Sequence, residues 1–464
     1  MSSLMRCLYC GLLQDEPQGV KVCARCGGEL TFEKQAATRS YVQVQMELDQ
    51  INAPADQIVV ERHLVVTIQT PSQVPEEEAA PTESGRDPLG FVAVLDVSGS
   101  MRGGKIASAK EAVRQAVQHL HDGDTFSLVT FADEVRTVFE PARMDRQLRS
   151  SVLDALKDVQ AGGRTALCGG LEAGVAAART QLQETNLVLL LSDGQANVGE
   201  TDLELLGARA LKGQKAGVTI STLGVGRDYN EALMVEIAIQ GGGRFYHVLG
   251  AEQIVPYVTG ELGEVSALAA RDARLSLTLP GGTGIQPFSA AYTIGGNGVQ
   301  LGDIPIDTRL EVVLRLLLPP QPEGARLPIE GRFSYRSPAG NELSTSLNVV
   351  TVRFVEPKAY DRRAGAVRPV VERVLEQMQA RSVLGSVRVA AIQGRQAADK
   401  QVQMSHQELH HYASLLGDEV AEQVAEAHRD LFVAMAAGPD KTKGAVHQAY
   451  SRHRSTKTFD KGSD

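Results

Sequence analysis

Short apolar runs alternate with segments of helical periodicity between residues 89 and 262. Such apolar runs are typical of parallel strands that are buried on both faces, and apolar residues recurring every three or four positions indicate helices that pack on them. The pattern predicts strands at 91–95, 126–131, 187–191, 218–223 and 244–248, and helices at 106–120, 147–159, 166–181, 203–215, 229–240 and 252–262. This order predicts a doubly wound α/β domain over residues 89–262, with helices on both faces of one sheet.

Period-two alternation of apolar and polar residues occurs on both sides of that block. It is found before the block at 41–48 and 58–68, and after it at 273–279, 310–318 and 333–335. Alternation predicts half-buried strands, but the two leading strands alone would not form a stable sheet. We therefore expect residues 36–70 and 265–356 to form one antiparallel β-sandwich into which the α/β domain is inserted. Two separate β modules are the alternative.

Three further segments differ in composition. Residues 71–88 contain four prolines and the run Glu76-Glu77-Glu78, so we expect an exposed acidic linker. Residues 357–440 carry helical periodicity without strand signals and predict a helical region. Residues 441–464 have six Lys/Arg and few apolar positions, which predicts a disordered basic tail.

The bulk composition places limits on the class of protein. With 464 residues, 43% hydrophobic and 22% charged, the chain is long enough for about three globular domains. Its formal net charge of −9 argues against generic nucleic-acid binding. No uncharged apolar run reaches 18 residues, and the first residues have no apolar core, so we expect neither a membrane span nor export.

Four of the five cysteines lie within twenty residues, as two CxxC pairs that are twelve residues apart and are each followed by glycine. Two residues between thiolates allow one tight turn to present both sulfurs to a single ion. The pattern predicts a closed tetrahedral Zn²⁺ site, which is structural, within residues 1–35; its ligands are Cys7, Cys10, Cys23 and Cys26. The spacing resembles the zinc-ribbon family, and disulfides are the alternative. The fifth, Cys168, is expected to be a small buried residue on a helix.

Asp96, Ser98 and Ser100 follow the strand at 91–95 and precede a helix. Ligand sites in open α/β sheets form at the carboxyl ends of strands. One carboxylate and two hydroxyls supply hard oxygen ligands of the kind that Mg²⁺ prefers. The sequence therefore predicts a magnesium site here, with the Asp96 carboxylate pointing into solvent at the edge of the sheet.

These residues resemble the metal-ion-dependent adhesion site of von Willebrand factor type A domains, a family with bacterial members that carry zinc ribbons or flanking β strands. Residues 162–167 resemble the loop that carries the family's metal-site threonine, and 189–194 resemble the strand end that carries its second aspartate. The resemblance covers residues 89–262. A degenerate copy that binds no metal is the alternative.

The resemblance implies a role for each residue. Asp96, Ser98 and Ser100 would hold Mg²⁺, or Mn²⁺ or Ca²⁺ in its place. Thr165 would join them directly or when a ligand binds, and Asp193 would contact the ion through water. An Asp or Glu side chain of a partner protein would take the remaining position.

Two motifs imitate enzymes but lack a required residue. Gly99 and Gly104-Lys105 follow the pattern of a phosphate-binding loop, yet Ile106 stands where a Ser or Thr must bind Mg²⁺. His406 and His410 have the spacing of a zinc protease helix, but Glu408 does not stand at the position where that helix requires its glutamate. We therefore expect a binding protein and not an enzyme.

The combined prediction is a multidomain α+β protein: a zinc ribbon, a doubly wound α/β domain inserted in an antiparallel β-sandwich, and a helical region. We expect a cytoplasmic, bacterial adaptor or scaffold that binds partner proteins through Mg²⁺. One alternative is a nucleic-acid-associated regulator that uses the ribbon and the basic tail. Another is an accessory subunit of an ATPase or of a protein-modifying complex.

Overall fold

The computed structural model describes residues 4–6, 13–15, 40–79, 87–193, 196–227, 229–249, 254–289, 292–295 and 298–454. The chain divides into two units, residues 1–39 and 40–464. In the first, β1 (Leu4–Arg6) and β2 (Leu13–Asp15) form an antiparallel pair. The predicted zinc ligands Cys7, Cys10, Cys23 and Cys26 lie outside the described residues.

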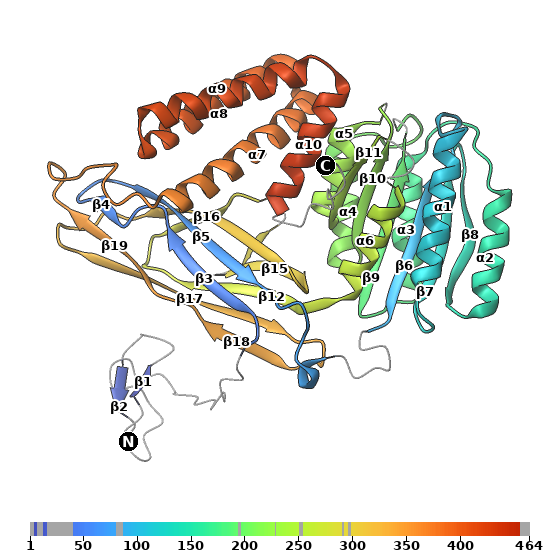
Figure 1. Ribbon diagram of the computed structural model, residues 1–464, viewed down its shortest axis with the longest axis horizontal. Coiled ribbons are helices and arrows are strands. Elements are labelled where there is room, and N and C mark those ends of the chain that lie inside the picture. Colours follow the sequence, from blue (N-terminus) through green and yellow to red (C-terminus); the bar gives the residue numbers. More distant parts are fainter. Residues whose placement is uncertain are drawn as a thin grey trace. The chain divides into compact units, whose positions relative to one another are not determined.

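The α/β part of the second unit contains a six-stranded sheet with the order β11-β10-β9-β6-β7-β8 (Figure 1). Its strands are β6 (Leu89–Asp96), β7 (Thr125–Phe131), β8 (Val135–Arg143), β9 (Thr185–Ser192), β10 (Thr219–Val225) and β11 (Gly242–Val248). Its helices are α1 (Gly104–His119), α2 (Arg146–Asp158), α3 (Leu167–Thr180), α4 (Leu203–Lys215), α5 (Glu231–Gln240) and α6 (Ile254–Ser266). Only β8 pairs antiparallel within this sheet. The predicted α/β domain is confirmed, and β8 is an addition to it.

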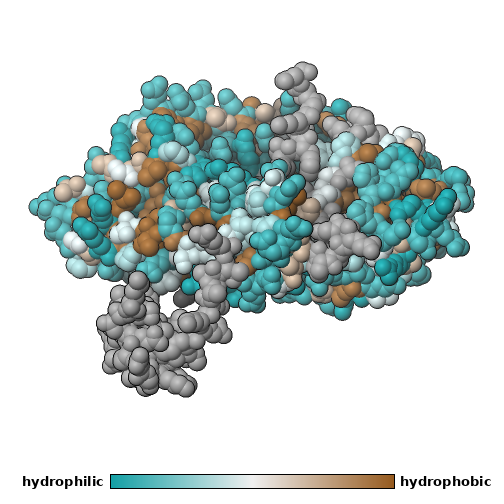
Figure 2. Space-filling view, turned by 60° about the horizontal axis from the view of Figure 1, so that its bottom comes forward, coloured by the Kyte–Doolittle hydropathy of each residue, from teal (hydrophilic) through white to brown (hydrophobic). Residues whose placement is uncertain are grey.

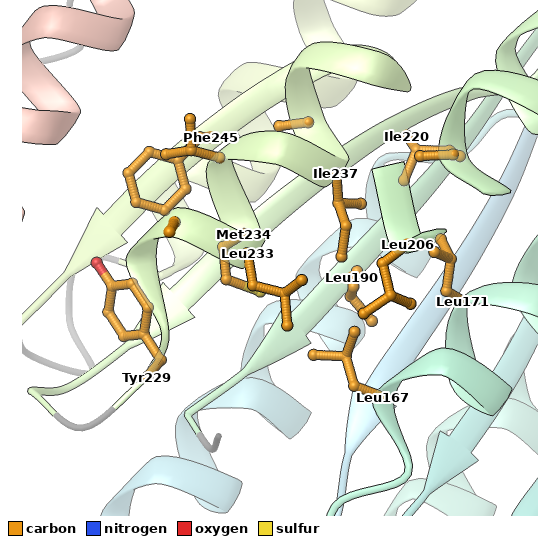
Figure 3. Packing of buried hydrophobic residues seen from close by; sticks show 14 of the residues in the cluster. Leu167, Leu171, Leu190, Leu206, Ile220, Tyr229, Leu233, Met234, Ile237 and Phe245 are labelled. Carbon is orange, nitrogen blue, oxygen red and sulfur yellow. The ribbon is translucent and has the colours of Figure 1, made fainter. Parts of the chain in front are cut away.

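Alternate residues of the central strands pack on opposite faces of this sheet. Val94 and Leu190 lie in a cluster with residues of α3, α4 and α5 (Figure 3), whereas Leu95 and Leu189 lie in a cluster with α1, α2 and α6. Helix α3 lies so close to the sheet at Gly170 that a Cβ there would stand 2.5 Å from the Phe131 ring. The absence of a side chain at Gly170 permits this approach. The continuous apolar runs of the strands thus reflect burial on two faces.

The flanking strands form two further sheets that share one hydrophobic cluster. The four-stranded sheet has the order β13-β16-β5-β3, from β3 (Gln43–Leu48), β5 (Val60–Gln69), β13 (Gly284–Pro287) and β16 (Arg309–Leu318). The seven-stranded sheet comprises β4 (Asn52–Pro54), β12 (Leu268–Thr278), β14 (Thr293–Gly295), β15 (Gly298–Pro305), β17 (Arg326–Arg336), β18 (Glu342–Ser346) and β19 (Val350–Val355). Strand β5, which precedes the α/β part, pairs along its whole length with β16, which follows it.

Part of the segment predicted to be an exposed linker is folded against the sheets. Residues 76–78 form the short 3₁₀ helix η1, in which Glu78 is buried. The Asn341 side-chain amide donates to Glu78 Oε2 at 3.0 Å, and the Ala339 amide donates to the Glu78 carbonyl at 3.0 Å. The hydrogen bond from Asn341 offsets part of the cost of burying the carboxylate. Glu76 and Glu77 are exposed, as expected, but Glu78 ties the segment to the sheets, which the expectation of an exposed linker did not include. Residues 80–86 lie outside the described part of the chain.

The helical region is confirmed and extends further than predicted. It comprises α7 (Arg368–Gln393), α8 (Arg395–Ala413), the 3₁₀ turn η4 (Ser414–Leu416), α9 (Asp418–Ala436) and α10 (Pro439–Arg454). The expectation of a disordered tail is wrong up to residue 454. The few apolar residues of α10 lie on one face, because Val446, Ala449 and Tyr450 recur at helical spacing and are buried. Tyr450 also donates a hydrogen bond to the Gly243 carbonyl of β11 at 2.7 Å.

The surface carries its large apolar residues in dispersed positions. The side of the protein in Figure 2 mixes hydrophilic residues with small hydrophobic groups. The exposed apolar side chains include Ile58 between β4 and β5, Met404 on α8 and Val433 on α9. Within the described ranges, no helix is both long enough and apolar enough to cross a membrane.

Lys443 attaches α10 to the α/β part. Only 3% of this residue is exposed, and its ammonium donates to the Tyr229 carbonyl at 3.0 Å and to Glu231 Oε2 at 2.6 Å. The ammonium also lies 4.6 Å from the centroid of the Tyr229 ring. A buried lysine is tolerated only when its charge is compensated in this way.

Replacing Lys443 with Met should therefore weaken the attachment of α10. The substitution keeps the length of the side chain but leaves the Tyr229 carbonyl and Glu231 without this donor, so the free energy of unfolding should fall by about 1–3 kcal/mol. Amide exchange in α10 should become faster. The matched control is Lys441→Met at an exposed position of the same helix. Equal stability of the two variants in urea denaturation would contradict the assignment.

Candidate metal centre

Two buried carboxylates meet at one edge of the parallel sheet. Strands β6 and β9 are neighbours and pair Leu95 with Leu191, so Asp96 at the end of β6 stands near Asp193, which follows β9. Both residues have 0% exposure. The expectation that Asp96 points into solvent is wrong, because the Ser98 amide and the Ser192 hydroxyl donate to its two oxygens at 2.8 Å and 2.5 Å.

Hydroxyl groups connect the two carboxylates. The turn η2 (Gly99–Met101) bends the chain after β6. It brings Ser98 Oγ to 3.0 Å from Ser100 Oγ, and Ser100 donates to Asp193 Oδ1 at 2.9 Å. Four of the five residues predicted for the Mg²⁺ site, all but Thr165, therefore belong to one hydrogen-bonded group.

Thr165 lies on a loop that is tied to this group through the backbone. The Gly99 amide donates to the Gly163 carbonyl at 2.9 Å. Gly163 has a φ of 82°, which favours glycine, and a Cβ there would collide with the Asp133 carboxylate. The Thr165 amide donates to Asn197 Oδ1 at 2.8 Å, and the Asn197 amide returns a bond to the Thr165 carbonyl at 3.1 Å. Thr165 is thus held, 3% exposed, on a loop that is hydrogen-bonded to the turn carrying Ser98 and Ser100.

Several residues of the site were not found by sequence reasoning. Lys105, at the start of α1, forms an ion pair with Asp193 Oδ2. In the sequence, Lys105 belongs to the incomplete phosphate-loop pattern, which indicates contact with a phosphate and not with an aspartate of the chain. Ser192 and Asn197 lie in the segment that resembles the second-aspartate strand end or just after it, but no motif distinguishes them. Their roles depend on contacts between distant parts of the chain.

The site holds the carboxyl groups of Asp96 and Asp193 away from solvent. Burial raises the pKa of Asp96, and the charge of Asp193 adds to the effect, while the hydrogen bonds from Ser192 and Ser98 oppose it. On the neighbouring loop, the Arg164 side chain lowers the pKa of Asp133. The carboxylate pair at the strand ends therefore favours a nearby cation.

The donor set fits a hard divalent cation. Two carboxylates, the hydroxyls of Ser98 and Ser100 and the neighbouring Thr165 supply only oxygen ligands, which suit Mg²⁺, Mn²⁺ or Ca²⁺. The described residues contain no cluster of three or more His, Cys, Asp or Glu arranged to hold a metal. A site at Asp96 and Asp193 would depend on hydroxyls for its remaining protein ligands.

The other candidate residues stay apart from this site. His410 lies on α8 and is 3.4 Å from Glu422 of α9, on the exposed surface. Cys168 is buried in α3, as expected, and burial raises the pKa of its thiol.

A family model of the von Willebrand factor type A domain matches residues 91–256, a stretch that contains Asp96, Thr165 and Asp193. The α/β part is a von Willebrand factor type A domain. The protein from Escherichia coli (strain K12) named "Uncharacterized protein YfbK" is 27% identical over 191 residues, which are 40% of this chain and 33% of that protein. This chain thus spans about a third of that relative's length.

Two solved structures share the fold over most of the chain. "von Willebrand factor type A from Catenulispora acidiphila" has a TM-score of 0.63 and 18% identity, and covers 92% of this chain and 99% of its own. The ArnB paralog VWA2 from Sulfolobus acidocaldarius has a TM-score of 0.58 and 18% identity, and covers 89% of this chain and 99% of its own. The similarity therefore extends beyond the von Willebrand factor type A domain itself.

Mg²⁺ should raise the unfolding temperature of the protein above its value in EDTA, because a ligand that binds only the folded state stabilises it. Asp96→Asn should abolish this rise. In EDTA the variant should unfold at or above the wild-type temperature, since one buried charge has been removed. Asp154→Asn on the exposed face of α2 serves as the control. A full Mg²⁺ response in Asp96→Asn would show that the ion binds elsewhere.

Proposed function

We propose that this protein is a metal-dependent adaptor whose von Willebrand factor type A domain binds an acidic residue of a partner protein. The observation that supports the proposal most directly is the hydrogen-bonded group of Asp96, Ser98, Ser100 and Asp193 at the strand ends. A divalent cation held there would offer an open coordination position to a carboxylate of the partner.

The surroundings of the site favour a negatively charged partner. Asp96, Ser98, Thr165 and Asp193 are buried, whereas Ser100 is exposed and the Lys105 side chain is 30% exposed. Solvent therefore reaches the site on the side of Ser100. Arg102 is exposed on the same turn, and its guanidinium lies 3.7 Å from the position of a Cβ at Gly162. Positive groups at this rim would attract an acidic side chain and speed its association.

The competing nucleic-acid hypothesis loses one of its two supports. It relied on a disordered basic tail, but residues 441–454 belong to α10, and Lys443 is buried in an ion pair. The net charge of −9 also opposes a polyanionic ligand. We therefore propose a role in protein binding rather than in nucleic-acid binding or catalysis.

Partner capture should depend on both the metal and the Thr165 hydroxyl. Immobilised protein should retain a specific set of proteins from its source organism in Mg²⁺ and release it in EDTA. Thr165→Ala should weaken retention about tenfold or more through the loss of one ligand oxygen, an effect of about 1.4 kcal/mol. Thr180→Ala, an exposed threonine at the end of α3, should leave retention unchanged. Identical captured proteins in Mg²⁺ and EDTA would contradict the proposed role.

We further propose that residues 1–35 form a zinc ribbon. The antiparallel pair of β1 and β2 supports this reading, since the segment that joins the two strands contains Cys7 and Cys10. Two residues between thiolates allow one turn to present both sulfurs to one ion. Because free thiolates persist in reducing compartments, the proposal includes a cytoplasmic location.

Elemental analysis of freshly purified protein should find about one zinc per chain, as four thiolates satisfy one tetrahedral ion. Cys23→Ser should lose the zinc and unfold the first unit while the Mg²⁺ response of the second remains, because small metal modules derive their folding free energy from the ion. Cys168→Ser is the control. Disulfides joining these cysteines, with little zinc present, would overturn the assignment.

A further inference from the structure

Lys105 occupies a position that helix stability alone does not explain. It is the second residue of α1, whose first turn contains no acidic residue. The amino end of a helix carries a partial positive charge, so a lysine there is electrostatically unfavourable for the helix. The favourable interaction lies outside the helix, because the Lys105 ammonium forms an ion pair with Oδ2 of fully buried Asp193.

The surrounding backbone fixes the direction of this side chain. Gly226, just after β10, has a φ of 86° and lies against the lysine. A Cβ at Gly226 would stand 3.1 Å from Lys105 Cε and 3.3 Å from Nζ. The absence of a side chain at Gly226 thus leaves the space through which Lys105 reaches Asp193.

Two donors among the described residues engage the Asp193 carboxylate. Ser100 donates to Oδ1 at 2.9 Å, and Lys105 occupies Oδ2. Asp96 is likewise engaged through both of its oxygens. In this arrangement the ammonium supplies the positive charge that the buried carboxylate pair requires.

We propose that Lys105 is a built-in counter-cation, and that a divalent ion binds this site by exchange with its ammonium. This inference rests on the proposed metal-dependent function. The ion and the ammonium compete for the negative charge of Asp193, so Lys105 weakens metal binding and stabilises the metal-free protein. The partly exposed lysine turns toward solvent as the ion enters. Lys105 is therefore a residue that sets the metal affinity without being a ligand.

Neutral substitutions of Lys105 test the exchange. Lys105→Met keeps the length of the side chain, and Lys105→Gln keeps a hydrogen-bond donor without the charge. Titration of Mn²⁺ and Mg²⁺ into each full-length variant, followed by calorimetry, should show affinity at least about tenfold above wild type, because no ion pair has to be broken. In EDTA both variants should unfold at lower temperature than wild type. Lys215→Met, at an exposed end of α4, is the matched control and should match wild type in both measurements.

The outcomes separate this inference from the function on which it rests. Tighter metal binding by both variants, together with lower stability in EDTA, supports the exchange. If wild type binds the ions and the variants bind equally or more weakly, the exchange is wrong while the metal site stands. If neither wild type nor the variants bind the ions, the proposed metal site fails and the exchange fails with it.

Discussion

The burial of two carboxylates at neighbouring strand ends imposes an electrostatic condition on the surrounding structure. Parallel pairing of β6 with β9 places Asp96 and Asp193 at the same edge of the sheet, where neither contacts solvent. Removing a carboxylate from water costs several kcal/mol unless hydrogen bonds and opposite charge replace the lost hydration. The Ser98 amide, the hydroxyls around it and the Lys105 ammonium supply that compensation.

The rest of the chain keeps these groups in place from two directions. At the amino ends of the strands, Arg271 of β12 forms ion pairs with Asp87, before β6, and with Glu184, before β9. On the other side, α10 holds the segment after β10 through Lys443 and Tyr229, three residues beyond Gly226. Contacts with β12 and with α10 therefore support the strands and the segment that border the site. Such support is what a preorganised binding site requires.

The sequence was informative wherever a local pattern reflects burial. Apolar runs and helical periodicity predict the order of strands and helices in the α/β domain, because both report packing against a core. Strand β8 was missed since it lies at the edge of the sheet and its residues are exposed or only partly buried. Helix α10 was missed because few of its residues are apolar, and because Lys443 and Tyr450 anchor it through contacts with distant parts of the chain.

At the site, motif spacing identified the residues that become neighbours, but not their environment. The burial of Asp96 depends on Ser192, which is 96 positions away, and the pairing of Lys105 with Asp193 spans 88 positions. Such contacts follow from the pairing of strands, which residue spacing along a single segment does not encode. For the same reason, a lysine within an incomplete phosphate-loop pattern gave no indication of its carboxylate partner.

A crystal structure of the protein grown with Mn²⁺, with the ion located by its anomalous scattering, tests the exchange between the ion and Lys105 most directly. We expect one peak among the oxygens of Asp96, Ser98 and Ser100, and a Lys105 ammonium that no longer contacts Asp193. A map without a peak at these residues, with the ion pair intact at saturating Mn²⁺, would contradict it.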